Sequence, residues 1–136
     1  ILSFLYTLYQ NKIMEQLEQQ VTSLEVSQRI EELGFKQFES YFQWVIDELP
    51  KKGRSYVSKT GDEIEPGNDR VDAYTVAELE IYLPTNVVCQ NTSFGEVLVK
   101  LLDEEGETIY FTREENGADA RAKMLCYLVE NKLITI

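Results

Sequence analysis

The main candidates for covalent or acid–base chemistry in this sequence are two cysteines and 24 carboxylates, and the chain contains no histidine. Histidine is the commonest general base near neutral pH and the usual partner of a serine or cysteine nucleophile. Cys89, in VVCQNTSFGE, has no base paired with it, and a lone cysteine after two valines more often packs in a core than reacts. Paired carboxylates in the acidic loops are the remaining catalytic option. We therefore predict a protein that is not an enzyme.

Metal chemistry has as little support in the residue types and their spacing. The two cysteines, Cys89 and Cys126, have no CxxC spacing, and without histidine most zinc sites are excluded. A calcium site made from Asp62, Glu65, Asn68, Asp69 and Asp72 would require D-x-[DN]-x-[DN]-G-x₅-E, which GDEIEPGNDRVD at 61–72 does not match. We expect no cofactor, an exposed loop at 61–72, and two reduced thiols, as in a cytoplasmic protein.

Negative charge is concentrated in the C-terminal part of the chain. Residues 1–59 carry eight acidic and seven basic side chains, whereas residues 60–136 carry sixteen and six, for a formal net charge of −11. Such a surface repels a phosphate backbone and favours solubility, a basic protein partner or imitation of DNA charge. Candidate partner-binding residues are the loop acids Asp62, Glu63, Glu65, Asp69 and Asp72, and a second group, Asp103, Glu104, Glu105 and Glu107.

The segment ILSFLYTLYQNKI precedes Met14 and has neither the basic start nor the cleavage site of a signal peptide. Its thirteen residues are fewer than the roughly 20 that span a bilayer, so no membrane association is expected. We expect residues 1–13 to be an N-terminal extension of a domain that starts at Met14. The alternative is an N-terminal helix whose exposed apolar face would bind a partner or form a homodimer.

The elements that must position any site begin with a helix over 23–33. Thr22 and Glu25 form a T-x-x-E capping box, Val26, Ile30 and Leu33 share one helical face, and Gly34 can end the helix. The following YFQWVI alternates as a strand does, and LPKKG at 49–53 supplies a turn before RSYVSK. The spacing therefore predicts a hairpin over 40–59 in place of the second helix of a helix-turn-helix.

The second half repeats this arrangement of a capped helix and a hairpin. Thr75 and Glu78 form another capping box, in AYTVAELEIYLP, and Pro84 ends that short helix. The strands EVLVKLL and TIYFTR flank DEEGE, in which Gly106 can take the left-handed position of a hairpin turn. The last element, ADARAKMLCYLVENKL, has the apolar periodicity of a helix, with two alanines that allow close approach to a sheet.

Together these elements predict an α+β fold, with one domain over 14–136 and helices packed on an antiparallel sheet. The hairpins are expected to join or stack, although separate ribbons remain an alternative. The residues expected in the core are Trp44, Phe42, Leu79, Val99, Phe111, Leu125 and Val129. The aromatic set of Tyr41, Phe42, Trp44, Tyr56, Tyr110 and Phe111 lacks the interleaved basic residues of a nucleic-acid stacking platform, which favours a sheet core.

Three blocks, VTSLEVSQRIEELGFKQFESYFQWV, AYTVAELEIYLP and DARAKMLCYLVENKLI, resemble in this order a family of small uncharacterised proteins encoded by bacterial phages, prophages and other mobile elements. The residues that carry the resemblance include Ser23-Leu24-Glu25, Glu32-Leu33-Gly34, Lys36-Gln37, Phe42, Trp44, Ala73-Tyr74-Thr75, Ala77-Glu78-Leu79, Leu83-Pro84, Asp119-Ala120, Ala122 to Leu125 and Glu130-Asn131. The sequence departs from the family pattern at Ser27, at Glu80-Ile81-Tyr82 and at Tyr127. The match covers most of residues 21–134 and omits residues 1–13. It implies a mobile-element setting in a bacterial host and no catalytic residues.

The combined expectation is a non-enzymatic interaction protein that binds a host or phage protein. One alternative is an acidic DNA mimic that inhibits a DNA-binding host protein. A second is a DNA-binding regulator that uses the 23–46 segment, although such a reader needs a second helix and a net basic face.

Overall fold

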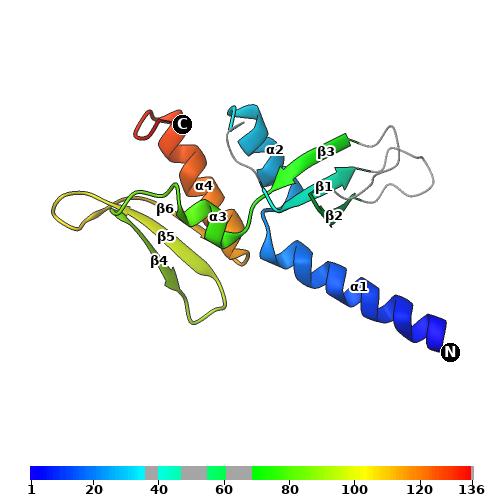
Figure 1. Ribbon diagram of the computed structural model, residues 1–136. Helices are drawn as coiled ribbons and strands as arrows, with labels where there is room; N and C mark the ends of the chain where they lie inside the picture. Colours follow the sequence, from blue (N-terminus) through cyan, green and yellow to red (C-terminus); the bar gives the residue numbers. More distant parts are fainter. Residues whose placement is uncertain (36–39, 47–54, 61–68, 136) are drawn as a thin grey trace.

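The computed structural model describes residues 1–35, 40–46, 55–60 and 69–135. Within these ranges the chain folds into helices and two three-stranded antiparallel sheets, which lie toward opposite ends of an elongated molecule with helices between them (Figure 1). The predicted α+β class is therefore confirmed. The two predicted hairpins do not join into one sheet. Each pairs with a third strand and forms a separate sheet.

The first sheet contains β1 (Phe42–Ile46), β2 (Ser55–Lys59) and β3 (Asp69–Ala73), in the order β2-β1-β3. β1 and β2 pair antiparallel, as the predicted hairpin over 40–59 requires, although the turn at 49–53 lies outside the described residues. β3 pairs with the other side of β1, so that Val71 lies opposite Trp44. The prediction of a loop over 61–72 is wrong from Asp69 onward, because Val71 and Ala73 face the core; residues 61–68 lie outside the described ranges.

Two helices precede this sheet, α1 (Leu2–Gln20) and α2 (Leu24–Glu32). Leu17, near the end of α1, packs with Val21 and Trp44 on the inner face of the sheet. The first half of α1 projects away from the rest of the molecule, and its apolar side chains stay exposed, with Leu2 at 84% and Phe4 at 66% (Figure 1). The helix continues without a break across Met14, so the proposed boundary at that residue does not coincide with the end of an element.

The second half contains α3 (Val76–Glu80), β4 (Val87–Asn91), β5 (Val97–Leu102), β6 (Thr108–Glu114) and α4 (Gly117–Glu130). β5 and β6 form the predicted hairpin, and Gly106 has a φ of +85° in its turn. β4 was not predicted; it pairs with the other side of β5 and gives the sheet order β4-β5-β6. The Thr75–Glu78 capping box of α3 forms as predicted.

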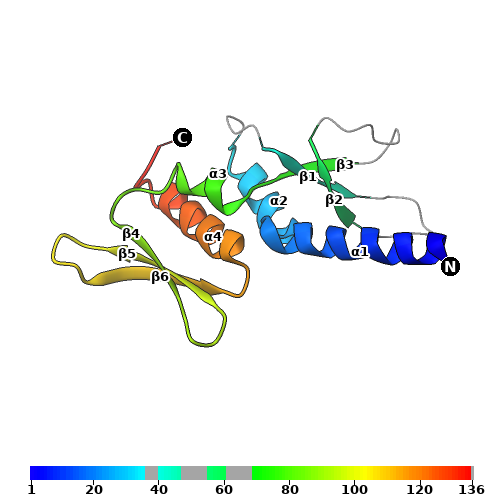
Figure 2. The ribbon, with the colours of Figure 1, turned by 60° about the horizontal axis from the view of Figure 1, so that its bottom comes forward.

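Helix α4 lies between the second sheet and the other helices (Figure 2). One side of α4 buries Ala120, Met124 and Leu128 against β5, and another side buries Ala122 and Leu125 against α2 and α3. The alanines allow the close approach that the sequence suggested. Arg121 on α4 also pairs with Glu80 on α3 at 3.1 Å.

The structure corrects the expectations for Thr22 and Phe111. Ser23, and not Thr22, caps α2, and its Oγ accepts a hydrogen bond from the Val26 N–H at 3.4 Å. Thr22 is instead fully buried and bonds Tyr74. Phe111 is 56% exposed, because it lies on the face of β6 that α4 does not cover. Of the other residues expected in the core, Trp44, Leu79, Val99 and Leu125 are buried, whereas Phe42 and Val129 are partly buried and packed against it.

Candidate functional site

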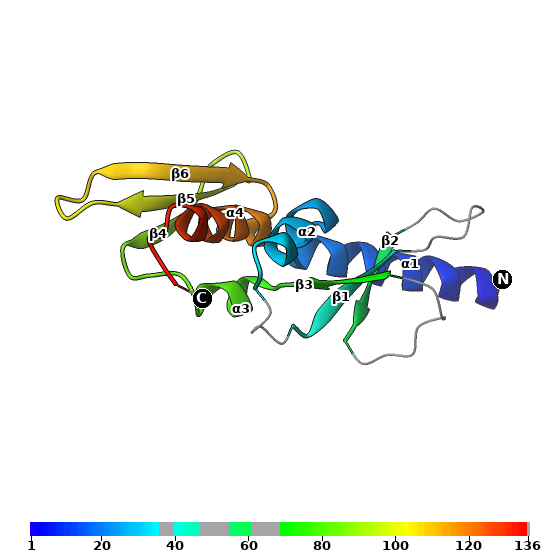
Figure 3. The same cartoon turned by 90° about the horizontal axis from the view of Figure 1, so that it is seen from above.

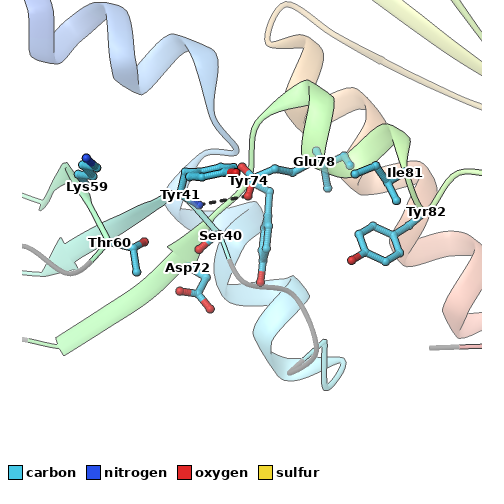
Figure 4. Close-up of a pocket in the computed structure, with 10 residues that line it drawn as sticks. Ser40, Tyr41, Lys59, Thr60, Asp72, Tyr74, Glu78, Ile81 and Tyr82 are labelled. Carbon is cyan, nitrogen blue, oxygen red and sulfur yellow. Dashed lines mark hydrogen bonds between the residues drawn. The ribbon is translucent and has the colours of Figure 1, made fainter.

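A cavity of about 690 Å³ lies where the first sheet meets α3. Its walls come from the residues before β1, the end of β2, the end of β3, and α3 with the turn that follows it (Figure 4). Three tyrosines and two carboxylates line it together with five other side chains: Ser40, Tyr41, Lys59, Thr60, Asp72, Tyr74, Glu78, Leu79, Ile81 and Tyr82. A concave site with apolar walls and a few convergent polar groups is the usual form of a ligand site.

The three tyrosines come from three different segments and differ in exposure. Tyr74, directly after β3, is 3% exposed and packs in the core with Leu79. Tyr82, after α3, is 38% exposed, and Tyr41, before β1, is 71% exposed. Figure 4 places Tyr74 between the other two rings. One ring is therefore fixed by packing, while the two beside it remain accessible to a ligand.

Glu78 fixes the relative position of these segments. One of its carboxylate oxygens, Oε1, accepts hydrogen bonds from the N–H and hydroxyl of Thr75, at 3.0 Å and 2.9 Å, in the capping box of α3. The other, Oε2, accepts from the backbone N–H of Tyr41 at 3.1 Å (Figure 4). The same carboxylate that caps the helix thus positions the Tyr41 side of the cavity.

The electrostatic field in the cavity is negative. Burial raises the pKa of the Tyr74 hydroxyl above its ordinary value, and the nearby carboxylates of Asp72, Glu78 and Glu31 raise this pKa further. Two carboxylates and one ammonium group, that of Lys59, line the walls. A negative field beside aromatic rings favours a cationic ligand, because ring faces also attract cations.

Of the predicted partner-binding acids that the structure describes, one lines this cavity. Asp72 does so from β3, whereas Asp69 is exposed at the start of the same strand. Asp62, Glu63 and Glu65 lie outside the described residues. The second predicted group, Asp103, Glu104, Glu105 and Glu107, is exposed in the β5–β6 turn on the other sheet, where the Asp103 carboxylate accepts the N–H groups of Glu105 and Glu107.

Local sequence patterns did not predict the cavity. Tyr41 was grouped with aromatics expected in a sheet core, and Tyr74 and Tyr82 stood out only as parts of the block around the capping box. Their convergence depends on β3 pairing with β1, a long-range contact that local patterns do not encode. The capping box was the one useful signal, because Glu78 belongs to it.

The cysteines give no active-site arrangement. Cys89 is exposed on β4, which corrects the expectation that it packs in a core, and burial of part of its side chain raises its thiol pKa. Cys126 is buried in α4, and burial raises its thiol pKa to about 11. Both thiols are free. A raised pKa lowers the thiolate fraction at neutral pH, which is the reverse of what a cysteine nucleophile requires.

The segment 23–46, which a DNA-binding regulator would use, contains α2 followed by β1, so among its described residues no second helix follows the first. In the part of the chain that the structure describes, no group of three or more Cys, Asp or Glu side chains is arranged to hold a metal ion. The described helices include none with both the length and the hydropathy needed to cross a membrane. Comparisons with protein-family models, with curated proteins and with solved structures found no match to this chain.

Proposed function

We propose that the protein is a non-enzymatic interaction module of phage or mobile-element type that binds a basic segment of a host or phage protein. The observation that carries this proposal is the cavity lined by Tyr41, Tyr74 and Tyr82 together with the carboxylates of Asp72 and Glu78. A lysine or arginine side chain from the partner would place its charged group near these carboxylates and rings. Its aliphatic stem would contact Leu79 and Ile81.

The chemistry of the cavity fits a cation better than an anion or a neutral ligand. A cation over a tyrosine face gains about 0.5–2 kcal/mol, depending on how far it is removed from water. The half-buried Glu78 carboxylate is held in place at the cavity wall by its hydrogen bonds to Thr75 and Tyr41. The net charge of −11 adds long-range attraction for a basic partner and increases the rate of encounter.

The test is affinity capture from bacterial lysate at low and high salt with three proteins: the unmodified chain, Tyr41→Ala combined with Asp72→Asn, and Glu105→Gln. Glu105→Gln removes one charge in the β5–β6 turn, far from the cavity, and is the matched control for the loss of charge at Asp72. A basic partner that is released by salt, lost with the double variant and retained by the control would support the proposal. A partner that binds all three proteins equally would contradict it.

The same experiment distinguishes this proposal from the alternative that the protein is an acidic DNA mimic. A mimic presents its charge over a broad surface, so each lost carboxylate would weaken capture by a similar amount, and generic DNA would compete for the partner. We keep this as the second candidate because the acids of the β5–β6 turn are exposed in a group. No described feature favours the DNA-binding regulator.

We also propose that α1 joins two copies of the chain. The first eleven residues carry no charged side chain, so two copies can meet there without bringing carboxylates together. Phe4, Tyr6 and Tyr9 are 63–66% exposed. With about 200 Å² for each aromatic side chain, they expose roughly 400 Å², half of the roughly 800 Å² that each partner buries in a standard interface. Leu2, Leu5 and Leu8, at 49–84% exposed, add to this area.

A further inference from the structure

We propose that the outer face of the β4–β6 sheet is a second docking surface, and that it binds a polypeptide segment in which apolar side chains alternate with carboxylates. The inner face of this sheet is covered by α4: Val99 and Leu101 are buried with Met124 of that helix, and Thr112 Oγ1 donates to the Ala120 carbonyl oxygen at 2.6 Å. Tyr110 on the same side stacks on Tyr127, with ring centroids 3.7 Å apart.

The opposite face has no such cover from the described elements. In Figure 3 α4 lies on one side of the sheet, and the described helices leave the other side open. The strand register identifies the residues on this side: Val88 lies opposite Lys100, Lys100 opposite Phe111, and Leu98 opposite Arg113. Of these residues Phe111 is 56% exposed, whereas Val88, Leu98 and Lys100 are partly buried. The outer face thus has an apolar side chain on each of its three strands: Val88 on β4, Leu98 on β5 and Phe111 on β6.

The outer face carries two basic side chains, Lys100 and Arg113, whereas the chain as a whole is acidic. Lys100 lies between Val88 and Phe111, and Arg113 lies beside Leu98. Glu96, at the edge, pairs with Arg113 at 3.6 Å. In a chain with 24 acidic and 13 basic side chains, an apolar face with this basic content selects a partner with carboxylates placed between apolar groups.

The side chains of the outer face also argue against two other kinds of partner. A second copy stacked on this face about a two-fold axis would bring the Lys100 side chains of both copies together in an apolar contact, which is unfavourable. A nucleic-acid strand binds through several aromatic rings interleaved with basic side chains, whereas this face has one phenyl ring, Phe111, and its Arg113 is already paired with Glu96. An acidic, apolar polypeptide avoids the first cost and reaches both cations.

The test is selection of a displayed library of random dodecapeptides on the full chain, with counter-selection on the variant Lys100→Glu, Phe111→Ser, Arg113→Glu. Each altered residue lies on the outer face, and Phe111 is exposed, so the variant keeps the core; circular dichroism and thermal unfolding would verify its fold. A variant with Lys132→Glu, an exposed lysine beyond α4, controls for a charge reversal elsewhere.

We expect the enriched peptides to contain acidic and apolar residues and to lose at least tenfold in affinity on the triple variant, with little change on the Lys132 control. Amide chemical shifts of Lys100 and Phe111 should move when such a peptide is added. Enrichment of basic peptides only, or no peptide that depends on this face, would overturn the proposal. The cavity variant Tyr41→Ala with Asp72→Asn should not affect these peptides, so this inference can fail independently of the proposed function.

Discussion

The backbone N–H of Tyr41 and the Oε2 oxygen of Glu78 are 3.1 Å apart, and this hydrogen bond ties the start of β1 to α3. Glu78 lies 37 residues further along the chain than Tyr41, and its other oxygen closes the capping box of its own helix. A single carboxylate therefore stabilises a local element and a long-range contact at the same place. The cavity between the first sheet and α3 depends on both.

Replacing Glu78 with alanine should destabilise the protein and weaken binding of a basic partner together. Loss of the cap and of the acceptor for the Tyr41 N–H should lower the free energy of unfolding by about 1–3 kcal/mol. Glu80→Ala, which removes the exposed partner of an ion pair with Arg121, is the control, and we expect it to cost less than about 1 kcal/mol. Urea denaturation measures both values. Equal effects of the two substitutions would show that Glu78 has no special role.

Replacing Thr22 with valine should destabilise the protein more than the similar shapes of the two side chains suggest. Thr22 is fully buried, and its Oγ1 accepts the backbone N–H of Tyr74 at 3.1 Å and contacts the Ser27 hydroxyl at 2.6 Å. Valine fills the same volume but leaves the Tyr74 N–H without this acceptor, which should cost about 1–3 kcal/mol in unfolding free energy. The exposed Thr85→Val is the matched control, with an expected change within about 0.5 kcal/mol.

Asp119 should make a measurable contribution to the pH dependence of stability. Burial raises the pKa of its carboxyl above 3.8, although the hydrogen bonds to Ser23 act in the opposite direction. A raised folded-state pKa means that the folded protein takes up this proton before the unfolded chain does. The contribution of Asp119 to stability is therefore most favourable below the unfolded pKa and is lost as the pH rises through the folded pKa.

The variant Asp119→Asn tests this sign. It keeps an oxygen that can accept the Ser23 N–H, which Asp119 Oδ1 does now at 2.7 Å, and it removes the titration. We expect the stability of the natural chain relative to this variant to increase as the pH falls toward 4, in urea titrations at a series of pH values. Asp119→Ala should be less stable than Asp119→Asn throughout, because it also removes the acceptor. A relative stability that decreases on acidification would refute the raised pKa.

Thiol labelling should distinguish the two cysteines. Cys89 is exposed and Cys126 is buried, so a thiol reagent should modify one group per folded chain and two per unfolded chain. Because its thiol pKa is raised, Cys89 should react more slowly at neutral pH than a cysteine in a short peptide, and its rate should increase as the pH rises. Mass spectrometry of partly labelled protein identifies the modified residue. Rapid labelling of Cys89 below pH 7 would instead indicate an activated nucleophile.

The self-association proposed for α1 can be measured by sedimentation equilibrium. The natural chain should show a monomer–dimer equilibrium, and Leu5→Gln with Leu8→Gln should shift it toward monomer at least tenfold, because both side chains are about half exposed on the projecting helix. Gln19→Ala with Gln20→Ala, on the polar end of the same helix, should leave the equilibrium unchanged. A monomer in all three proteins would exclude a dimer through α1.

Local sequence signals predicted most of the elements. The capping box at Thr75, the apolar period over Val26 and Ile30, and the turn at Gly106 each specify an element through contacts within a few residues. The α2 cap shows the limit of such signals: Thr22 and Ser23 can both cap a helix, and the choice depends on Tyr74, which is 52 residues away from Thr22 and binds its hydroxyl.

The features that sequence patterns missed depend on long-range pairing. β3 lies in DRVDA, where only two apolar residues alternate, so its strand character is apparent only once it pairs with β1. Phe111 and Val99 belong to adjacent strands with similar composition, yet one is exposed and the other buried. The side of the sheet on which α4 packs decides this difference. The cavity combines segments from residue 40 to residue 82, so it could not be read from any single motif.

The alanines of α4 have a consequence for how partners could engage the molecule. Ala118, Ala120 and Ala122 are at most 1% exposed, and they hold the helix close to its neighbours on two sides. The cavity at α3 and the outer face of the β4–β6 sheet are therefore separated by a tightly packed spacer. A single partner that carried a basic and an acidic segment would bind the second site as an intramolecular step, at an effective concentration set by its linker. Its affinity would then depend on whether that linker matches a fixed span, and an enlarged alanine in α4 would change the span without altering either site.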